Sequence, residues 1–326
     1  MGRLVAALGL ALSCPALAQQ PLTGRQAESY RAYEAATPHR AFAVGTGSAA
    51  FRWLSGGASL DKVIADALGG CARNNADKPC TLYAVNNVVL NGRDWQVAVP
   101  SRDPAAADIG RLRPHPYVAM RGPRSASGLV VWSHGYRQGS DSTQSPAQPY
   151  VGRFVAAGYD LYRFDRQYIN DWAGDATSLA AAVNQARQMG YRRIVLAGQS
   201  AGGWVSIAAL ARGAAVDGVI AVAPAHHGET QRMNDVSIAR SAWQQIIGGV
   251  RPGPRVAVVL FAGDTYDVGG RGADAKAVLT RNGVSHLVID QPQNFTGHGA
   301  GAAVVFDRTF GACLFSFVET GAAPCQ

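Results

Sequence analysis

Residues 193–204 read RIVLAGQSAGGW, and the fold we expect follows from this stretch. Its first half is a β-branched apolar run typical of a buried strand, and its second half opens an alanine-rich helical pattern. Gly198, Ser200 and Gly202 form a G-x-S-x-G pattern at the junction. A sharp strand-to-helix turn of this kind exposes the serine hydroxyl on a strained backbone and leaves space only for small neighbours. The stretch therefore predicts a serine nucleophile at the carboxyl end of a buried strand.

The alternation of apolar runs and helical patterns continues on both sides of this stretch. We expect strands at 128–133, 159–164, 193–198, 218–223, 256–263 and 286–290. We expect helices at 150–157, 176–190, 201–211, 273–282 and 304–319. Strands that alternate with helices form a mostly parallel sheet with helices on both faces. The fold class is therefore α/β, and functional residues are expected at the carboxyl ends of the strands.

A serine nucleophile needs a histidine as general base, and the histidine needs a carboxylate that fixes its tautomer. His298 lies in a glycine-flanked loop after the last expected strand, whereas His286 opens that strand at its opposite end. Asp264 and Asp267 both follow the strand at 256–263. Asp267 lies further from the strand and has more freedom to turn back toward the histidine. We therefore prefer Asp267 as the acid and keep Asp264 as the alternative, with a turn-forming role if it is not the acid.

The oxyanion of a tetrahedral intermediate needs two N–H donors. Ala201, the residue after the serine, is expected to supply one from its backbone. The other is expected from the loop Ser133-His134-Gly135-Tyr136, and the N–H of Tyr136 is our choice.

Two further segments lie near the expected site. His226-His227 follows a strand end and is placed to line a pocket, although no carboxylate or cysteine completes a metal set there. The stretch 228–254, with Met233, Trp243, Ile246 and Ile247, lies where a cap can be inserted. Its apolar residues are consistent either with a substrate lid or with a helix that covers the sheet.

Residues 128–319 resemble the α/β-hydrolase family. The features that carry the resemblance are the serine turn, the pair His134-Gly135, and an acid and His298 that both follow Ser200. The pair Gly202-Gly203 is similar to that of secreted esterases and of prolyl-oligopeptidase-like peptidases. The loop after the first strand lacks the His-Gly-Gly-Gly run of many lipases and esterases. The resemblance therefore implies a serine hydrolase that needs no cofactor, and it identifies no subfamily.

The function we expect is hydrolysis of a small-molecule or polymer-borne carboxylic ester through an acyl-enzyme on Ser200. A serine peptidase of the prolyl-oligopeptidase-like type is the alternative among enzymes, although such peptidases usually carry a large extra domain. A catalytically inactive α/β-hydrolase fold that binds the cell envelope is the alternative from another class. The motifs leave the acyl and alcohol parts of the substrate open, because these depend on pocket volume.

The N-terminus predicts export. Arg3, the apolar run at 4–12 and Ala16-Leu17-Ala18 form a signal peptide at residues 1–18, cleaved after Ala18. The run is shorter than the about 20 residues of a membrane-spanning helix, and no later segment is long enough. A lipoprotein anchored through Cys14 is the less favoured alternative, because the residues before this cysteine match a lipobox poorly. We expect a secreted or periplasmic protein.

Four cysteines remain after such cleavage, and they are Cys71, Cys80, Cys313 and Cys325. An even number in an oxidising compartment implies disulfides, and the local spacing favours pairing the first two and the last two. Neither pair has the spacing of metal ligands, so no metal site is expected.

We divide the remaining chain into a polar lead-in at 19–40, a small disulfide-stapled α+β module at 41–100 and a catalytic domain at 101–326. Within the module we expect a strand at 41–45, a helix that starts after the N-cap Ser59, and a strand at 81–85. This arrangement resembles small Cys-paired modules of exported bacterial proteins, and the resemblance assigns no activity to it.

Composition excludes other classes of protein. The chain has 326 residues, 48% hydrophobic and 16% charged, which is too apolar for a disordered protein. Its formal net charge is +8, and nearly all of its basic residues are arginines scattered singly along the chain. Nucleic-acid binders cluster such residues, so we expect no nucleic-acid partner. Loose attraction to an anionic envelope is the expected role of the charge.

Overall fold

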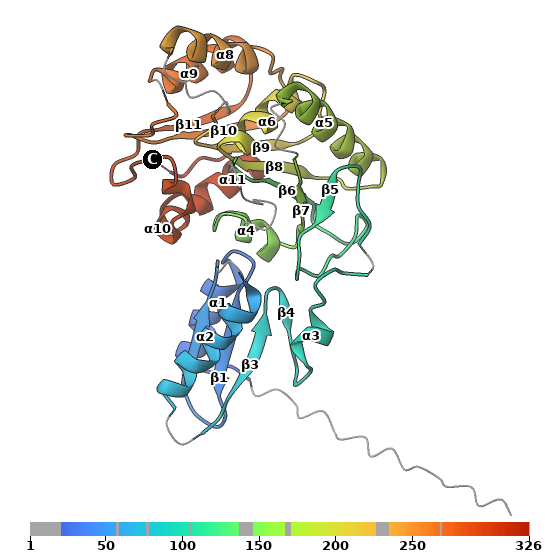
Figure 1. Ribbon diagram of the computed structural model, residues 1–326, viewed down its shortest axis with the longest axis vertical. Helices are drawn as coiled ribbons and strands as arrows, with labels where there is room; N and C mark the ends of the chain where they lie inside the picture. Colours follow the sequence, from blue (N-terminus) through green and yellow to red (C-terminus); the bar gives the residue numbers. More distant parts are fainter. Residues whose placement is uncertain are drawn as a thin grey trace, which may run out of the picture.

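The computed structural model describes residues 21–56, 59–75, 78–104, 106–136, 146–166, 171–225, 235–267 and 269–325. These residues form a four-stranded sheet near the N-terminus and a seven-stranded sheet in the rest of the chain (Figure 1). Within the described ranges, no helix has both the length and the apolar character needed to cross a membrane.

The large sheet has the order β11-β10-β9-β8-β6-β7-β5. Its strands are β5 (Leu112–Pro114), β6 (Leu129–Ser133), β7 (Asp160–Phe164), β8 (Ile194–Gln199), β9 (Gly218–Val222), β10 (Arg255–Leu260) and β11 (His286–Asp290). Neighbouring strands are parallel, except that β5 pairs antiparallel with β7 at the edge. The chain passes from β6 to β7 on one side and then to β8 on the other. The strand order therefore reverses between β6 and β8, which is where ligands bind in open α/β sheets.

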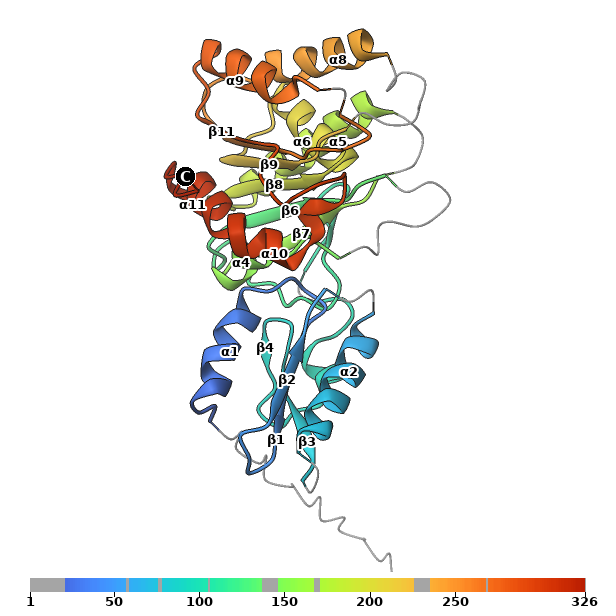
Figure 2. The ribbon, with the colours of Figure 1, turned by 90° about the vertical axis from the view of Figure 1, so that its left-hand side faces the viewer.

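Helices cover both faces of this sheet (Figure 2). The helices are α4 (Val151–Ala156), α5 (Trp172–Gln188), α6 (Ala201–Leu210), α8 (Val236–Gly248), α9 (Arg271–Arg281), α10 (Val304–Phe306) and α11 (Ala312–Thr320). Helices α5, α6, α8 and α9 pack on one face with Val131 and Leu196, and α4, α10 and α11 pack on the other with Val130 and Val195. Successive strand residues thus enter opposite cores. The expected α/β arrangement, a mostly parallel sheet with helices on both faces, is confirmed.

Helix α8 packs against α6 and α9 in the helical layer on one side of the sheet. Trp243 and Ile247 are buried in the same core as α5 and α6, and Ile246 packs against that core. The sequence left two roles open for residues 228–254, a substrate lid or a packing helix. The described part, from residue 235 onward, forms a packing helix. Met233 and His226-His227 lie outside the described residues.

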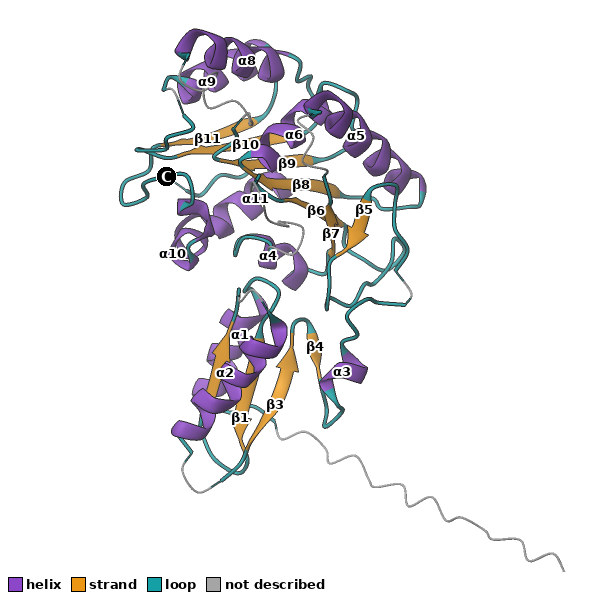
Figure 3. Cartoon of the chain, viewed as in Figure 1, coloured by secondary structure: helices purple, strands orange, loops and turns teal. Residues whose placement is uncertain are grey.

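The four-stranded sheet is antiparallel, in the order β2-β1-β3-β4. Figure 3 shows β1, β3 and β4 side by side. Its elements are β1 (Ala41–Gly45), β2 (Phe51–Leu54), α2 (Leu60–Arg73), β3 (Cys80–Val85) and β4 (Val88–Val89), followed by α3 (Trp95–Ala98). Helix α2 buries its apolar side on one face, whereas α1 (Arg25–Glu34) lies on the other over aromatic side chains (Figure 2). The expected strands at 41–45 and 81–85 and the helix after Ser59 are confirmed.

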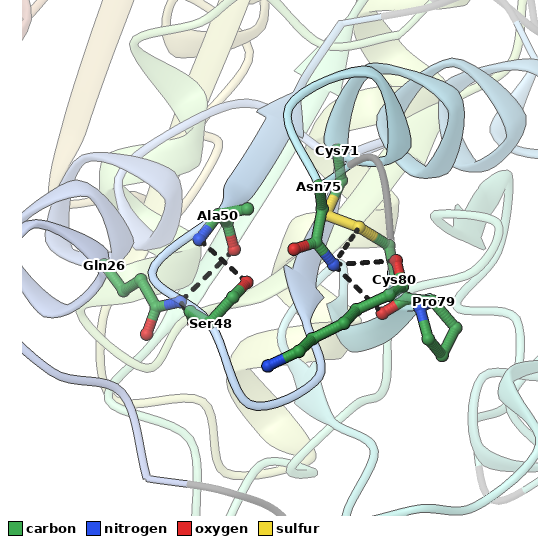
Figure 4. The surroundings of a disulfide bond; sticks show 8 residues. Gln26, Ser48, Ala50, Cys71, Asn75, Pro79 and Cys80 are labelled. Carbon is green, nitrogen blue, oxygen red and sulfur yellow. Dashed lines mark hydrogen bonds between the residues drawn. A yellow bond between two sulfur atoms is a disulfide. The ribbon is translucent and has the colours of Figure 1, made fainter.

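The expected polar lead-in contains a helix that the sequence pattern did not predict. Only Gln26 and Tyr33 of α1 are buried, so the helix has too few apolar positions to show a helical period. Gln26 instead makes polar contacts, since its side-chain Nε2 donates to the carbonyl oxygens of Ser48 and Ala50 at 3.2 Å (Figure 4).

Both expected disulfides are present. Cys71–Cys80 joins the last turns of α2 to the start of β3 (Figure 4). Asn75 lies between the two cysteines in the sequence, and its Nδ2 donates to the carbonyl of Lys78 at 2.8 Å. Cys313–Cys325 ties α11 to the C-terminal residues. The pairing by local spacing is confirmed.

The two sheets meet at a buried polar junction beside α4. Thr37 donates to the carbonyl of Ala147, and a Cβ on Gly152 of α4 would collide with the carbonyl of Ala36. His39 and His115 are both buried there, with their ring centroids 5.8 Å apart. The close backbone approach and the buried side chains place the small module directly against the seven-stranded region.

Candidate active site

Ser200 lies at the turn between β8 and α6, at the point where the strand order reverses. Its backbone has φ 55° and ψ −122°, a conformation that L-residues rarely adopt. Its N–H donates to the carbonyl of Val222 at 2.9 Å, which ties the turn to the end of β9. The strained turn that the G-x-S-x-G pattern predicts is therefore present at this serine.

Three glycines allow this turn to pack. A Cβ on Gly202 would collide with the carbonyl oxygen of Ser133 at the end of β6, and a Cβ on Gly198 would collide with the backbone of Gly202. Gly203 lies beside Ala221 of β9, where a Cβ would be 3.4 Å from that residue's Cα. The small residues around Ser200 are thus required by backbone contacts with β6 and β9.

His298 binds Asp264. The imidazole Nδ1 is 2.9 Å from each carboxylate oxygen of Asp264, whose side chain is 2% exposed, against 21% for the histidine. The loops that carry the two residues also pair through their backbones, since the N–H of Gly297 donates to the carbonyl of Ala262 at 2.8 Å. A buried carboxylate at this distance holds the ring with Nδ1 protonated and leaves Nε2 as the acceptor.

The structure pairs His298 with Asp264, the alternative acid, whereas the preferred Asp267 contacts Arg271. The chain turns immediately after β10, where Gly263 has φ 67°. This turn directs the side chain at position 264 to the histidine. Asp264 also accepts from the N–H of Tyr266 at 2.8 Å, so it forms the local turn and binds the histidine at once.

Asp267 has a different partner, Arg271 at the start of α9. The Nε of Arg271 is 3.5 Å from Oδ1 of Asp267, and the same oxygen accepts from the N–H of Gly269 at 3.0 Å. Burial raises the pKa of Asp267, and the positive charge of Arg271 partly opposes that rise. The N–H of Asp267 donates to the carbonyl of Asp264, so the pair braces the loop that carries the acid.

Arg271 is buried and held from three sides. Its Nη1 donates to the carbonyl of Pro224 at 2.7 Å, and its guanidinium lies 5.8 and 5.7 Å from the ring centroids of Trp204 and Trp243. Burial lowers the pKa of this arginine, which the carboxylates of Asp267 and Asp264 oppose. Sequence reasoning missed this residue, because a lone arginine at a helix start carries no periodic signal.

The serine and histidine loops are in direct contact. The side chain of Gln199, next to the serine, donates to the carbonyl of His298 at 3.4 Å. A Cβ on Gly135 would collide with that glutamine side chain and lie 3.4 Å from the Cβ of Ser200. The structure therefore brings together the serine turn, the His298 loop and the His134-Gly135 loop.

The two expected oxyanion donors belong to the serine turn and to the loop after β6, whose Gly135 lies next to Ser200. Ala201 is the first residue of α6, so its N–H has no carbonyl partner within the helix. Tyr136 ends the described part of the loop after β6. Their role as donors stays a prediction.

Tyr266 is a neighbour of the histidine that sequence reasoning did not single out. Its ring centroid is 4.5 Å from that of His298, and the side chain is partly exposed. The only feature of the sequence that could have indicated Tyr266 is its position two residues after Asp264.

In the described ranges there is no group of three or more His, Cys, Asp or Glu side chains placed to hold a metal ion.

No protein-family model matches the chain, and no curated protein matches it. Among solved structures, a truncated form of a carbohydrate esterase from gut microbiota aligns with a TM-score of 0.48 and 14% identity, over 64% of this chain and 90% of that one. A puromycin-hydrolysing peptidase of Mycobacterium tuberculosis aligns with a TM-score of 0.48 and 14% identity, over 66% of this chain and 38% of that one. An esterase of Pyrococcus furiosus aligns with a TM-score of 0.45 and 15% identity, over 60% and 81%. Such similarity concerns the backbone arrangement and not the chemistry.

Proposed function

We propose, from the α/β-hydrolase fold and the side chains at its carboxyl edge, that this chain is an exported serine hydrolase that cleaves carboxylic esters through an acyl-enzyme. Ser200 is the nucleophile, His298 the general base and Asp264 the residue that orients the imidazole. The observation that carries the proposal is the bond between Asp264 and His298 in a loop that contacts the strained turn of Ser200.

The proposed reaction needs only these groups and water. Oγ of Ser200 attacks the acyl carbon while Nε2 of His298 takes the hydroxyl proton, and the N–H groups of Ala201 and Tyr136 stabilise the oxyanion. The C–O bond to the alcohol then breaks, and His298 returns the proton to the leaving oxygen. A water molecule deprotonated by His298 attacks the acyl-enzyme, which releases the acid and restores the serine.

The position of Asp264 supports this order of events. Its carboxylate is buried and bound through both oxygens to Nδ1, so it stabilises the imidazolium that forms when the serine loses its proton. Asp267, which is already paired with Arg271, is not available for this role.

The site does not distinguish an ester from a peptide bond. We favour the ester because the N-terminal module is small, whereas prolyl-oligopeptidase-like peptidases usually carry a large extra domain. Residues 25–98 hold its four strands and three helices. We infer export from residues 1–18, and the oxidising compartment this implies is consistent with two disulfides.

A serine-reactive fluorophosphonate tests the nucleophile. We expect it to label the wild-type chain and to spare Ser200→Ala, while Ser178→Ala on α5 is labelled like the wild type. Equal labelling of Ser200→Ala and the wild type would sink the proposal.

Substrate class is tested by rates on matched compounds. We expect turnover of short-chain nitrophenyl esters and none of aminoacyl nitroanilides. Cleavage of the amides at comparable rates indicates a peptidase, and labelling without turnover of either class contradicts ester hydrolysis. Salt-sensitive retention on an anionic polymer together with no labelling supports an inactive, envelope-binding fold.

A further inference from the structure

The small module has a cavity of its own, far along the chain from Ser200. It has a volume of about 510 Å³ and lies at the open edge of β2, the first strand in the sheet order. The start of α1 borders it on one side and Asn74, the C-cap of α2, on the other. Its size falls within the range of cavities that bind small molecules, about 300–1,000 Å³.

The cavity lining combines aromatic rings and cations. Phe51 and Trp53 of β2 are partly buried and face the aromatic cluster under α1. Arg25 and Arg52 line the same cavity, and none of its described lining residues is acidic. The stem of Arg52 lies against α2, where a Cβ on Gly70 would be 2.8 Å from its Cγ.

These two arginines differ from several arginines of the seven-stranded region, which form ion pairs with aspartates. Arg111, Arg153 and Arg187 each reach an aspartate oxygen at 2.6–2.8 Å. Within the described part of the chain, neither Arg25 nor Arg52 forms an ion pair or a side-chain hydrogen bond. Their guanidinium groups therefore retain all their donors for a ligand.

The position of the cavity wall is fixed by other residues. Gln26 donates to the carbonyls of Ser48 and Ala50, which holds the start of α1 to the loop before β2 (Figure 4). The Cys71–Cys80 disulfide ties the end of α2, next to Asn74, to β3. The walls are thus connected by contacts that leave the arginines uninvolved.

We propose that this cavity binds an anionic saccharide. An aromatic ring offers an apolar surface to the C–H face of a sugar ring, and guanidinium groups bind a carboxylate or sulfate through paired hydrogen bonds. Asn74 and Thr23 supply neutral hydrogen-bonding groups for hydroxyls. Arg25 and Arg52 give the cavity a positive charge that selects for acidic sugars. The module is then a binding site for a charged glycan, whatever reaction Ser200 performs.

Titration of the whole chain with oligogalacturonate, followed by calorimetry and tryptophan fluorescence, tests the site. We expect saturable binding that weakens with added salt, with no comparable binding of neutral cellohexaose. Arg25→Ala/Arg52→Ala is expected to lose affinity by roughly tenfold or more, since a hydrogen bond to a charged group contributes about 1.5–3 kcal/mol. Trp53→Phe is expected to keep binding and to lose much of the fluorescence change.

Arg31→Ala is the matched control, because Arg31 is an exposed arginine of α1 outside the cavity lining. It removes the same charge and should leave the affinity unchanged. Equal affinity in the double variant and the wild type overturns the proposal, as does tight binding of cellohexaose or of inorganic phosphate alone. Hydrolysis of a small soluble ester by the double variant should match the wild type, so this result is separate from any failure of the proposed catalytic role.

Discussion

The seven-stranded and four-stranded regions of this chain are stabilised in different ways. The large sheet is buried on both faces by helices, and most of its strand residues are fully inaccessible. The small sheet is covered by an aromatic cluster and one amphipathic helix, and a disulfide ties that helix to β3. A large core tolerates a strained residue such as Ser200, whose backbone cost is about 1–3 kcal/mol. A small core depends on its cross-link and presents its edge and its arginines to solvent.

The comparison teaches that the residues of the proposed reaction lie in one region and the two arginines of the proposed binding cavity lie in the other. The carboxyl edge of the large sheet holds Ser200, Asp264 and His298, with Asp267 paired to Arg271. The edge of β2 holds Arg25 and Arg52, which form no ion pair with an acidic residue in the described ranges. If the two regions have separate roles, variants in one should leave the property of the other unchanged.

The largest expected effect comes from removing the serine hydroxyl. Ser200→Ala should lower the turnover of a nitrophenyl ester by about 10⁴–10⁶-fold, because the nucleophile is lost. Its melting temperature should remain close to that of the wild type. Stopped-flow assays and calorimetry measure the two quantities. Wild-type turnover by this variant would show that the chemistry lies elsewhere.

Replacing each of the two aspartates after β10 should have a different effect on the rate of ester hydrolysis. Asp264→Asn should lower kcat/KM by about 10⁴-fold, because the amide no longer holds the histidine in its working tautomer. Asp267→Asn should lower kcat/KM by about tenfold or less, because its side chain pairs with Arg271 and does not contact the histidine. Steady-state kinetics on one ester measures both. The reverse ranking would restore Asp267 as the acid.

Acid should weaken the junction between the two regions. Burial, aided by His39, lowers the pKa of His115 to about 3 from 6.5. A histidine kept neutral in the folded chain binds its proton more readily when unfolded, so stability is full above pH 6.5 and falls as the pH drops toward 3. The free energy of unfolding should fall by about 3 kcal/mol between pH 7 and pH 4 from this group.

Urea titrations at several pH values, with His115→Gln as the matched variant, test this dependence. The variant should lose part of the acid sensitivity while keeping its stability difference from the wild type constant above pH 7. The same slope in both chains below pH 6.5 would show that His115 does not contribute.

The smallest expected effect is confined to the small region. Cys71→Ser/Cys80→Ser opens a loop of sequence separation 9 and should lower the free energy of unfolding of that region by about 2–3 kcal/mol. Hydrolysis of a small ester should stay at the wild-type rate. Hydrogen exchange resolves the two regions in the intact chain. Loss of ester hydrolysis together with the disulfide would mean that the regions are not independent.

Much of the large region could be predicted from its sequence, because a buried parallel strand reads as a continuous apolar run. Residues 194–199 and 218–222 form strands close to where the pattern indicates. Strand β5 was missed because it has three residues, includes Pro114 and lies antiparallel at the edge. Helix α1 was missed because its buried contacts are a glutamine and a tyrosine.

The candidate site was predicted in part. The serine turn and His298 follow from local patterns of small residues beside strands. The sequence did not indicate which of Asp264 and Asp267 contacts His298, because this depends on how the chain turns at Gly263 and on the buried charge of Arg271. Neither feature leaves a mark on spacing or composition.

Local order along the chain was enough to place Ser200 at a strand-to-helix junction, to pair the cysteines and to define an α/β fold, because these follow from short-range periodicity and turn chemistry. The packed chain alone decided that Asp264 meets a histidine 34 residues away and that Arg25 and Arg52 line one cavity. Side-chain direction at a turn and contacts between distant segments depend on how whole layers pack. No short stretch of sequence contains that information.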